Sequence, residues 1–149
     1  MKLLRTLVAP LLAVTVVAGC GDSNGPGTEA TINALAGTWN ATSLVFTNNA
    51  NSSETFDLIA DGGSFSITFT AAGGFSGSST FEGDTDTFSG TFEVQGSNLI
   101  ISETGESGPE TIAFTLSGNT LTLTLDDEFD FDDDGFDEPA TLTITLQRA

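Results

Sequence analysis

The sequence predicts an all-β protein, most simply an antiparallel up-and-down β-barrel of about eight to ten strands, with a β-sandwich as the alternative. Apolar and polar residues alternate with a period of two in many short runs, which is typical of half-buried strands. Turn sequences rich in Gly, Asn and Asp separate these runs. The connections are too short for helical crossovers, so neighbouring strands must be antiparallel, and consecutive hairpins favour a barrel.

Nine runs meet these criteria, after a single helical turn expected over Thr31–Leu35 and ended by Gly37. The alternation is clearest in SFSITFT and in TLTLTL, where every second residue is Phe, Ile or Leu and the others are Ser or Thr. The expected strands are Thr38–Thr47, Thr55–Ile59, Ser64–Thr70, Gly74–Phe81, Thr87–Val94, Leu99–Glu103, Glu110–Ser117, Thr120–Leu125 and Ala140–Gln147.

Charge and composition exclude several classes of function. The 149 residues include 3 basic and 21 acidic side chains, a net charge of −18, with no His, no Tyr and one Cys. Such a surface repels nucleic acid, so no nucleic-acid partner is expected. A single Cys permits no internal disulfide. Without His, and with no Lys after residue 2, the usual bases of nucleophilic catalysis are missing, so the protein is not expected to be an enzyme.

The first nineteen residues have the pattern of an export signal. Lys2 and Arg5 precede an apolar stretch over Leu7–Val17 that is too short to span a bilayer. The following Val17-Ala18-Gly19-Cys20 resembles the lipobox of bacterial lipoproteins, and the only Cys falls where that motif requires it. The resemblance implies cleavage before Cys20 and attachment of lipid to its sulfur; an ordinary signal peptide is the alternative.

Cleavage before Cys20 would leave 1 basic and 21 acidic residues, a net charge of −20. Residues 20–30 are expected to form a flexible tether, because Gly21–Glu29 is rich in Gly, Pro and polar residues. Residues 31–149 then form a single barrel domain. The expected location is the cell envelope, held to the membrane by the N-terminal lipid. Gly21 beside the cysteine does not resemble an inner-membrane retention signal, so the outer membrane is favoured where the host has one.

The segment Leu35–Ser43 resembles the opening Gly-x-Trp strand of lipocalin-like proteins, with Gly37 and Trp39 at the signature positions. In that family the Trp closes one end of an eight-stranded barrel, and an Arg from the last strand lies across its ring. Arg148 matches that Arg. The resemblance implies binding of a small apolar ligand. The chain departs from the family in having no Tyr, no disulfide and no C-terminal helix.

Two functions are therefore open. In the first, the barrel binds a small apolar ligand, and the small residues Gly77, Ser79 and Gly90 leave space beside the Phe residues that share their face. In the second, the protein is a structural or interaction lipoprotein with a packed core and a Ca²⁺-ordered acidic loop. The volume of the interior discriminates between them.

That loop begins after the eighth expected strand and reads DDEFDFDDDGFDE. Asp130, Asp132 and Asp134 are spaced as in the first half of a Ca²⁺-binding loop, and Gly135 permits the turn that such a loop requires. Asp137 or Glu138 would complete the set of oxygen ligands. The alternative is a solvated acidic connection between two strands.

Overall fold

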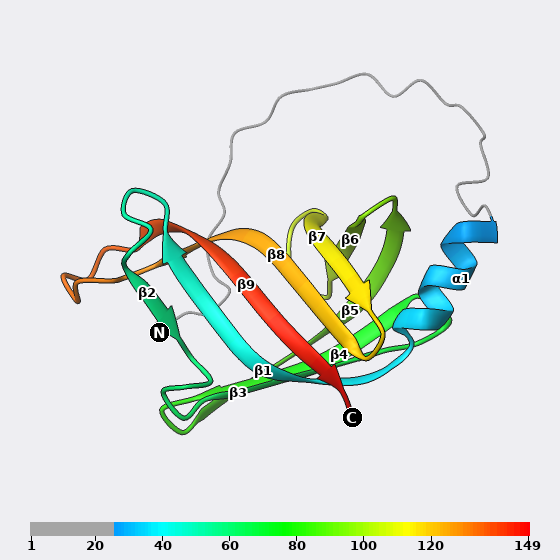
Figure 1. The fold of residues 1–149 in the computed structure, drawn as a ribbon, viewed down its shortest axis with the longest axis horizontal. Helices are drawn as coiled ribbons and strands as arrows, with labels where there is room; N and C mark the ends of the chain where they lie inside the picture. Colours follow the sequence, from blue (N-terminus) through cyan, green and yellow to red (C-terminus); the bar gives the residue numbers. More distant parts are fainter. Residues whose placement is uncertain (1–25) are drawn as a thin grey trace, which may run out of the picture.

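The computed structural model describes residues 26–149; Cys20 and the signal sequence lie outside the described residues. One helix precedes nine strands (Figure 1). In chain order the elements are α1 (Pro26–Leu35), β1 (Gly37–Asn48), β2 (Thr55–Asp57), β3 (Ser64–Phe69), β4 (Gly74–Phe81), β5 (Asp84–Gln95), β6 (Asn98–Glu103), β7 (Glu110–Ser117), β8 (Thr120–Phe129) and β9 (Glu138–Arg148).

The strands form one antiparallel sheet that closes on itself. β1 pairs with β3, each strand from β3 to β8 pairs with the next, and β9 returns to β1. The closing ladder runs from Trp39 opposite Arg148 to Asn48 opposite Ala140, with a bulge between Ala41 and Ser43. Eight strands make the barrel, and β2 adds a short extra strand beside β1. The barrel prediction is confirmed, and the sandwich alternative is not what the chain forms.

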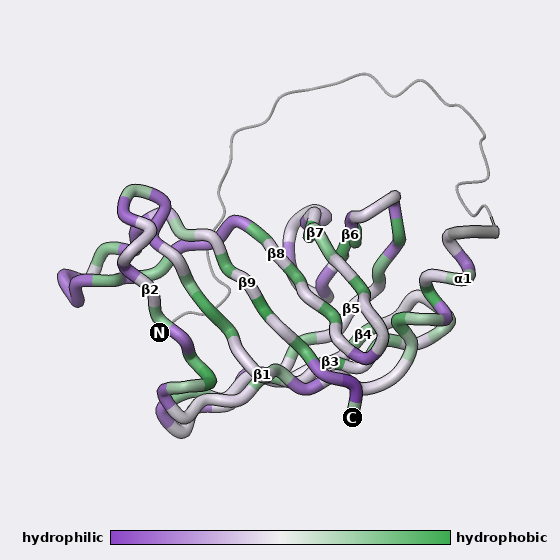
Figure 2. Tube along the Cα trace, viewed as in Figure 1, coloured by the Kyte–Doolittle hydropathy of each residue, from purple (hydrophilic) through white to green (hydrophobic). Residues whose placement is uncertain are grey.

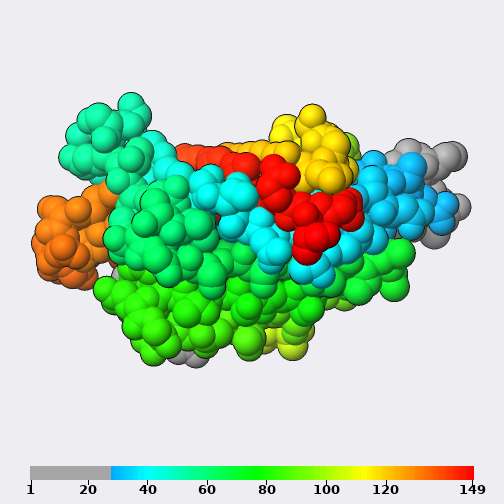
Figure 3. Space-filling view, turned by 60° about the horizontal axis from the view of Figure 1, so that its bottom comes forward, coloured from blue at the N-terminus to red at the C-terminus, as the bar shows by residue number. Residues whose placement is uncertain are grey.

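Because successive strands run in opposite directions, the connections alternate between two ends of the barrel (Figures 1 and 3). We call one end the helix end: α1, the start of β1, the end of β9 and the turns 70–73, 96–97 and 118–119. We call the other the acidic end: β2 with its flanking loops, the turn 82–83 and the connections 104–109 and 130–137. Figure 3 shows α1 and the loop 130–137 at opposite extremes of the molecule.

The barrel interior is filled by the apolar residues of the alternating pattern. In β8 the buried Leu121 and Leu123 alternate with partly exposed Thr, and β9 repeats this with Leu142, Ile144 and Leu146. Figure 2 shows the same alternation of hydropathy along the strands. Each such side chain contributes roughly 1.5–3 kcal/mol by leaving water, so the period-two pattern is the main driving force for closure.

Gly77 and Gly90 do not leave beside them the interior space that the sequence suggested. Gly77 lies opposite Phe88, and Gly90 opposite Phe75. A Cβ on Gly77 would lie 2.4 Å from the Phe88 ring, and one on Gly90 would lie 2.9 Å from the Phe75 ring. The rings therefore occupy the room that a side chain would need, and these glycines serve packing between adjacent strands.

Several boundaries differ from the sequence-based expectation, and three of them have a clear local reason. The helix begins at Pro26, where a missing N–H costs nothing, so residues 26–30 of the expected tether are helical. β2 ends at Asp57, because the Asp57 carboxylate accepts hydrogen bonds from the N–H groups of Leu44 and Ile59 and starts a turn. β8 continues to Phe129, because Asp126–Phe129 pair with the start of β9.

Candidate functional site

The helix end is closed by Trp39 and Arg148. Trp39 is fully buried and its indole N–H donates to the Leu35 carbonyl at 2.8 Å. The Arg148 guanidinium carbon lies 4.2 Å from the centroid of the Trp39 ring, a cation–π contact. Arg148 also donates to the carbonyl of Ala34, in the last turn of α1, and to the carbonyl of Ala36, the residue that follows the helix. A single side chain thus joins the last strand to the first strand and to the helix.

Gly37 is required between the helix and β1 for two physical reasons. Its φ of +130° is a backbone conformation that residues with a side chain rarely adopt. A Cβ at this position would also lie 2.7 Å from Nη1 of Arg148. The three residues singled out by the family resemblance, Gly37, Trp39 and Arg148, therefore meet at one point and form a single structural unit.

Beside this unit lies an open depression of about 440 Å³. Its two walls come from different parts of the chain: α1 on one side, and the β5–β6 turn with the inner face of β7 on the other. Phe114 and Leu116 share the inward face of β7 with the buried Ile112, so the depression exposes the edge of the core. The lining residues are Ala30, Thr31, Ala34, Gly96, Ser97, Phe114 and Leu116.

At the acidic end, the loop between β8 and β9 gathers its carboxylates. Single ligand oxygens of Asp130, Asp132, Asp134 and Glu138 all lie within 4.8 Å of one another. Backbone N–H groups hold them there: those of Asp134 and Gly135 donate to Asp130, and that of Phe131 donates to Glu138 Oε2 at 2.9 Å. Four of the five expected ligands are thus brought together, and Asp137 lies outside the group. Carboxylate oxygens are the type of ligand that Ca²⁺ prefers, and its usual six to eight ligands would need further oxygens from the loop or from water.

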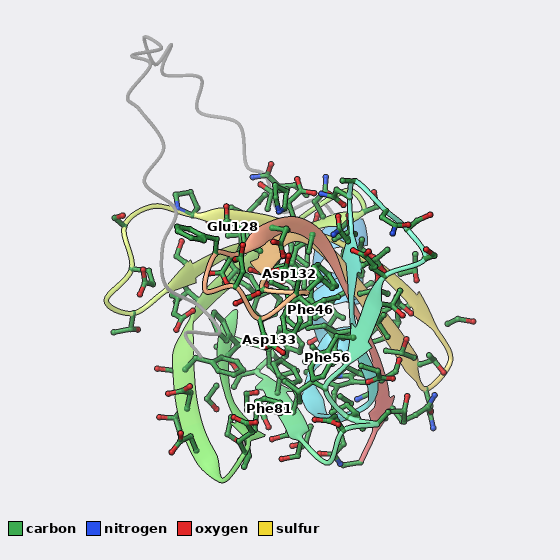
Figure 4. The ribbon with its side chains drawn as sticks, turned by 90° about the vertical axis from the view of Figure 1, so that its left-hand side faces the viewer. Phe46, Phe56, Phe81, Glu128, Asp132 and Asp133 are labelled. Carbon is green, nitrogen blue, oxygen red and sulfur yellow. The ribbon has the colours of Figure 1, made fainter. Side chains whose placement is uncertain are left out.

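An aromatic cluster lies directly beneath this loop (Figure 4). The Phe129 ring stacks between Phe46 and Phe56, with ring centroids 4.8 Å apart in both pairs. Phe131 contacts Phe129 edge-on at 5.0 Å, and Phe81 contacts Phe56 in the same way at 5.7 Å. Because Phe129 and Phe131 directly precede the loop carboxylates, the position of the loop depends on the packing that closes this end of the barrel.

Three further carboxylates at the acidic end face inward by strand parity. Burial raises the pKa of Glu110, and the charges of Asp127 and Glu103 raise it further. Burial also raises the pKa of Asp127; the Glu128 N–H opposes this, and the charges of Glu128 and Asp137 add to it. The pKa of Glu103 is raised by burial and by Glu106. These residues hold a proton more tightly than they would in water.

The sequence-based reasoning missed these carboxylates and the depression. The signal for the carboxylates was present, since Glu110, Asp127 and Glu103 each stand two residues from an inward apolar residue. The depression has no comparable signal, because its walls come from α1, the β5–β6 turn and β7 and meet only in the folded barrel.

Cys20, the predicted lipidation site, lies outside the described residues. Within residues 26–149, no helix has the length and apolar character needed to span a membrane.

The comparisons agree with this geometry. The sequence matches the lipocalin-like domain family over residues 35–123, more than half of the chain, so the protein belongs to that family. The match begins at Leu35 and includes Gly37 and Trp39. No curated protein and no solved structure gives a significant match. Proteins with the lipocalin-like fold are typically ligand-binding proteins and not enzymes. The barrel of this protein is therefore consistent with binding of a small hydrophobic ligand.

The Arg148 contacts give the first testable prediction. Arg148→Ala removes the cation–π contact and the hydrogen bonds to the end of α1, so the free energy of unfolding should fall by about 1–3 kcal/mol. Arg148→Lys should recover only part of this loss, because an ammonium group cannot lie flat on the indole and reach both carbonyls. Urea unfolding followed by Trp39 fluorescence measures both changes. The neighbouring Gln147→Ala is the matched control, and equal stability of Arg148→Ala and the parent would contradict the assignment.

Proposed function

We propose that this protein is a non-enzymatic, lipid-anchored lipocalin-like protein of the cell envelope, with the outer membrane as the favoured site, and that it binds a small apolar ligand. Membership of the lipocalin-like family supports a binding role. The Val17–Cys20 motif supports the anchor, since several acyl chains on one cysteine hold a protein stably to a membrane. We assign the ligand site to the depression beside α1 as part of this proposal.

The size and lining of this depression carry the ligand proposal. The depression has a volume of about 440 Å³, enough for a small molecule, and its wide opening would leave part of a bound ligand in contact with solvent. Phe114 and Leu116 supply apolar surface, Ala30 and Ala34 are small residues on the helix side, and Ser97 is a polar residue of the lining. The space beside Gly77 and Gly90, by contrast, is filled by aromatic rings.

Filling the depression tests the ligand proposal. Ala34→Trp places a large ring on the helix wall of the depression. It should raise the Kd for the uncharged apolar dye N-phenylnaphthylamine about tenfold, which corresponds to a loss of ~1.4 kcal/mol of binding free energy. Asn33→Trp is the matched control, since Asn33 is an exposed residue of the same helix outside the lining. Fluorescence titration of the domain starting at residue 21 measures both. Equal weakening by the two variants, or no dye binding by the parent, would contradict the proposal.

Replacing the predicted lipidation site tests the anchor. Cys20→Ser removes the sulfur that would carry the lipid, so the protein should move from the membrane fraction to the soluble fraction. Fractionation of expressing cells, with immunoblotting of each fraction, measures the change. Ser23→Cys in the same tether, combined with Cys20→Ser, is the control for a cysteine outside the motif. A Cys20→Ser protein that stays membrane-bound at the mass of the parent would refute the anchor.

The acidic loop supports a second proposed function, the binding of Ca²⁺ as a structural ion. The observation in its favour is the convergence of the Asp130, Asp132, Asp134 and Glu138 oxygens within 4.8 Å. Four negative charges this close repel one another, and a divalent cation would offset that repulsion. The ion would then help to hold Phe129 and Phe131 in the aromatic cluster, as in the structural or interaction lipoprotein that the sequence left open.

Calorimetry with Ca²⁺ tests this second proposal. We expect saturable binding with a Kd on the order of 10⁻⁴–10⁻³ M, the range of extracellular modules. The double variant Asp132→Ala/Asp134→Ala should abolish the heat. Asp133→Asn is the matched control, because it removes one charge from the same loop without removing a member of the converging group. Unchanged heat in the double variant, or an equal loss in Asp133→Asn, would contradict a specific site.

A further inference from the structure

The acidic residues are divided very unequally between the two ends of the barrel. Residues 26–149 contain twenty Asp and Glu side chains, and eighteen of them lie toward the acidic end. Only Glu29 and Glu93 of these twenty lie toward the helix end, which also holds Arg148. The eighteen fall in four segments that the topology brings to the same end: residues 54–61, 82–86, 103–110 and 126–138.

The outer wall between the two ends is almost uncharged. Outward positions of β3 and β4 are Ser, Thr or Gly, as in the pairs Ser66 with Ser78 and Thr68 with Ser76. The outward positions shared by β8 and β9 likewise pair Thr122 with Thr145. The molecule therefore has a strong charge asymmetry along the barrel axis, with negative charge concentrated at one end rather than spread over the surface.

The chain leaves the barrel at the end that carries little charge. α1 begins at Pro26, and its N-terminal end points away from the strands (Figure 1). Five residues separate Cys20 from Pro26, so the six Cα–Cα steps of this link span at most about 22 Å even when fully extended. β5 has 12 residues, about 40 Å of strand and roughly 30 Å along the axis of a tilted barrel. A lipid on Cys20 could not reach past the acidic end.

We propose that the helix end of the barrel faces the lipid bilayer and that the acidic end points away from it. The proposal rests on the lipid anchor at Cys20 proposed above. The length of the tether permits this orientation and opposes the inverted one. The charge distribution favours it independently: anionic lipids give a membrane surface a negative potential, which decays within a Debye length of about 8 Å at physiological salt. The eighteen carboxylates then lie more than one Debye length from the surface.

Energy transfer from the protein to lipid probes tests this orientation. The lipidated protein is isolated from membranes and reconstituted in phosphatidylcholine vesicles containing phosphatidylglycerol and a rhodamine-labelled lipid. Its Cys20 sulfur is blocked by lipid, so a fluorescent maleimide labels only an introduced cysteine. Asn119→Cys places the donor in an exposed turn at the helix end, and Ser52→Cys places it in an exposed loop at the acidic end. We expect a larger loss of donor fluorescence for the Asn119→Cys label.

Each outcome bears on a separate proposal. The mass of the N-terminal peptide shows whether Cys20 is modified; an unmodified Cys20 would overturn the anchor and the orientation that rests on it. A modified Cys20 with equal transfer from both positions, or greater transfer from Ser52→Cys, would overturn the orientation alone.

The difference in energy transfer between the two labelled positions should persist in vesicles made of phosphatidylcholine only, because the tether limits the orientation whether or not the lipids are charged. It should be larger with phosphatidylglycerol, and a smaller difference there would contradict the role of the carboxylates.

Discussion

The ladder between β1 and β9 is the constraint on which the rest of the fold depends. An open sheet of amphipathic strands would leave two unpaired edges and an exposed apolar face. Closure removes both, and it requires the two ends of the domain to meet. Trp39 and Arg148 stand opposite each other at one end of this ladder, and Arg148 also donates to the Ala34 carbonyl in the last turn of α1. The same contact therefore closes the barrel and fixes the helix that forms one wall of the depression.

Much of the fold could be predicted from the sequence because one physical signal dominates it. The period-two alternation is a property of consecutive residues, and short turns leave antiparallel pairing as the only arrangement. The pattern failed where a second interaction took over locally. Asp57 ends β2 early because its carboxylate binds backbone N–H groups, and Phe129 extends β8 because its ring packs between Phe46 and Phe56. Neither effect is visible in the alternation of polar and apolar residues.

The candidate sites also differ in how far the sequence alone predicts them. The loop carboxylates are close together in the sequence, so their convergence could be predicted, although the local turn geometry leaves Asp137 outside the group. Glu103, Glu110 and Asp127 come from three strands, and their raised pKa values reflect burial and mutual repulsion that exist only once β6, β7 and β8 are aligned. The depression depends on the placement of α1 against β7, which follows from barrel closure and not from any single segment.

The two ends of the barrel differ in a way that separates their chemistry. The acidic end combines a high density of carboxylates with a cluster of Phe rings, which suits a cation at the surface and a tightly packed closure beneath it. The helix end combines low charge, the start of the tether and the open apolar edge of the core. With the helix end toward the bilayer, the proposed ligand site and the proposed anchor lie on the same side of the protein. An apolar molecule leaving the membrane would then meet the depression without passing the carboxylates, so the charge asymmetry and the position of the site support a ligand that is exchanged with lipid.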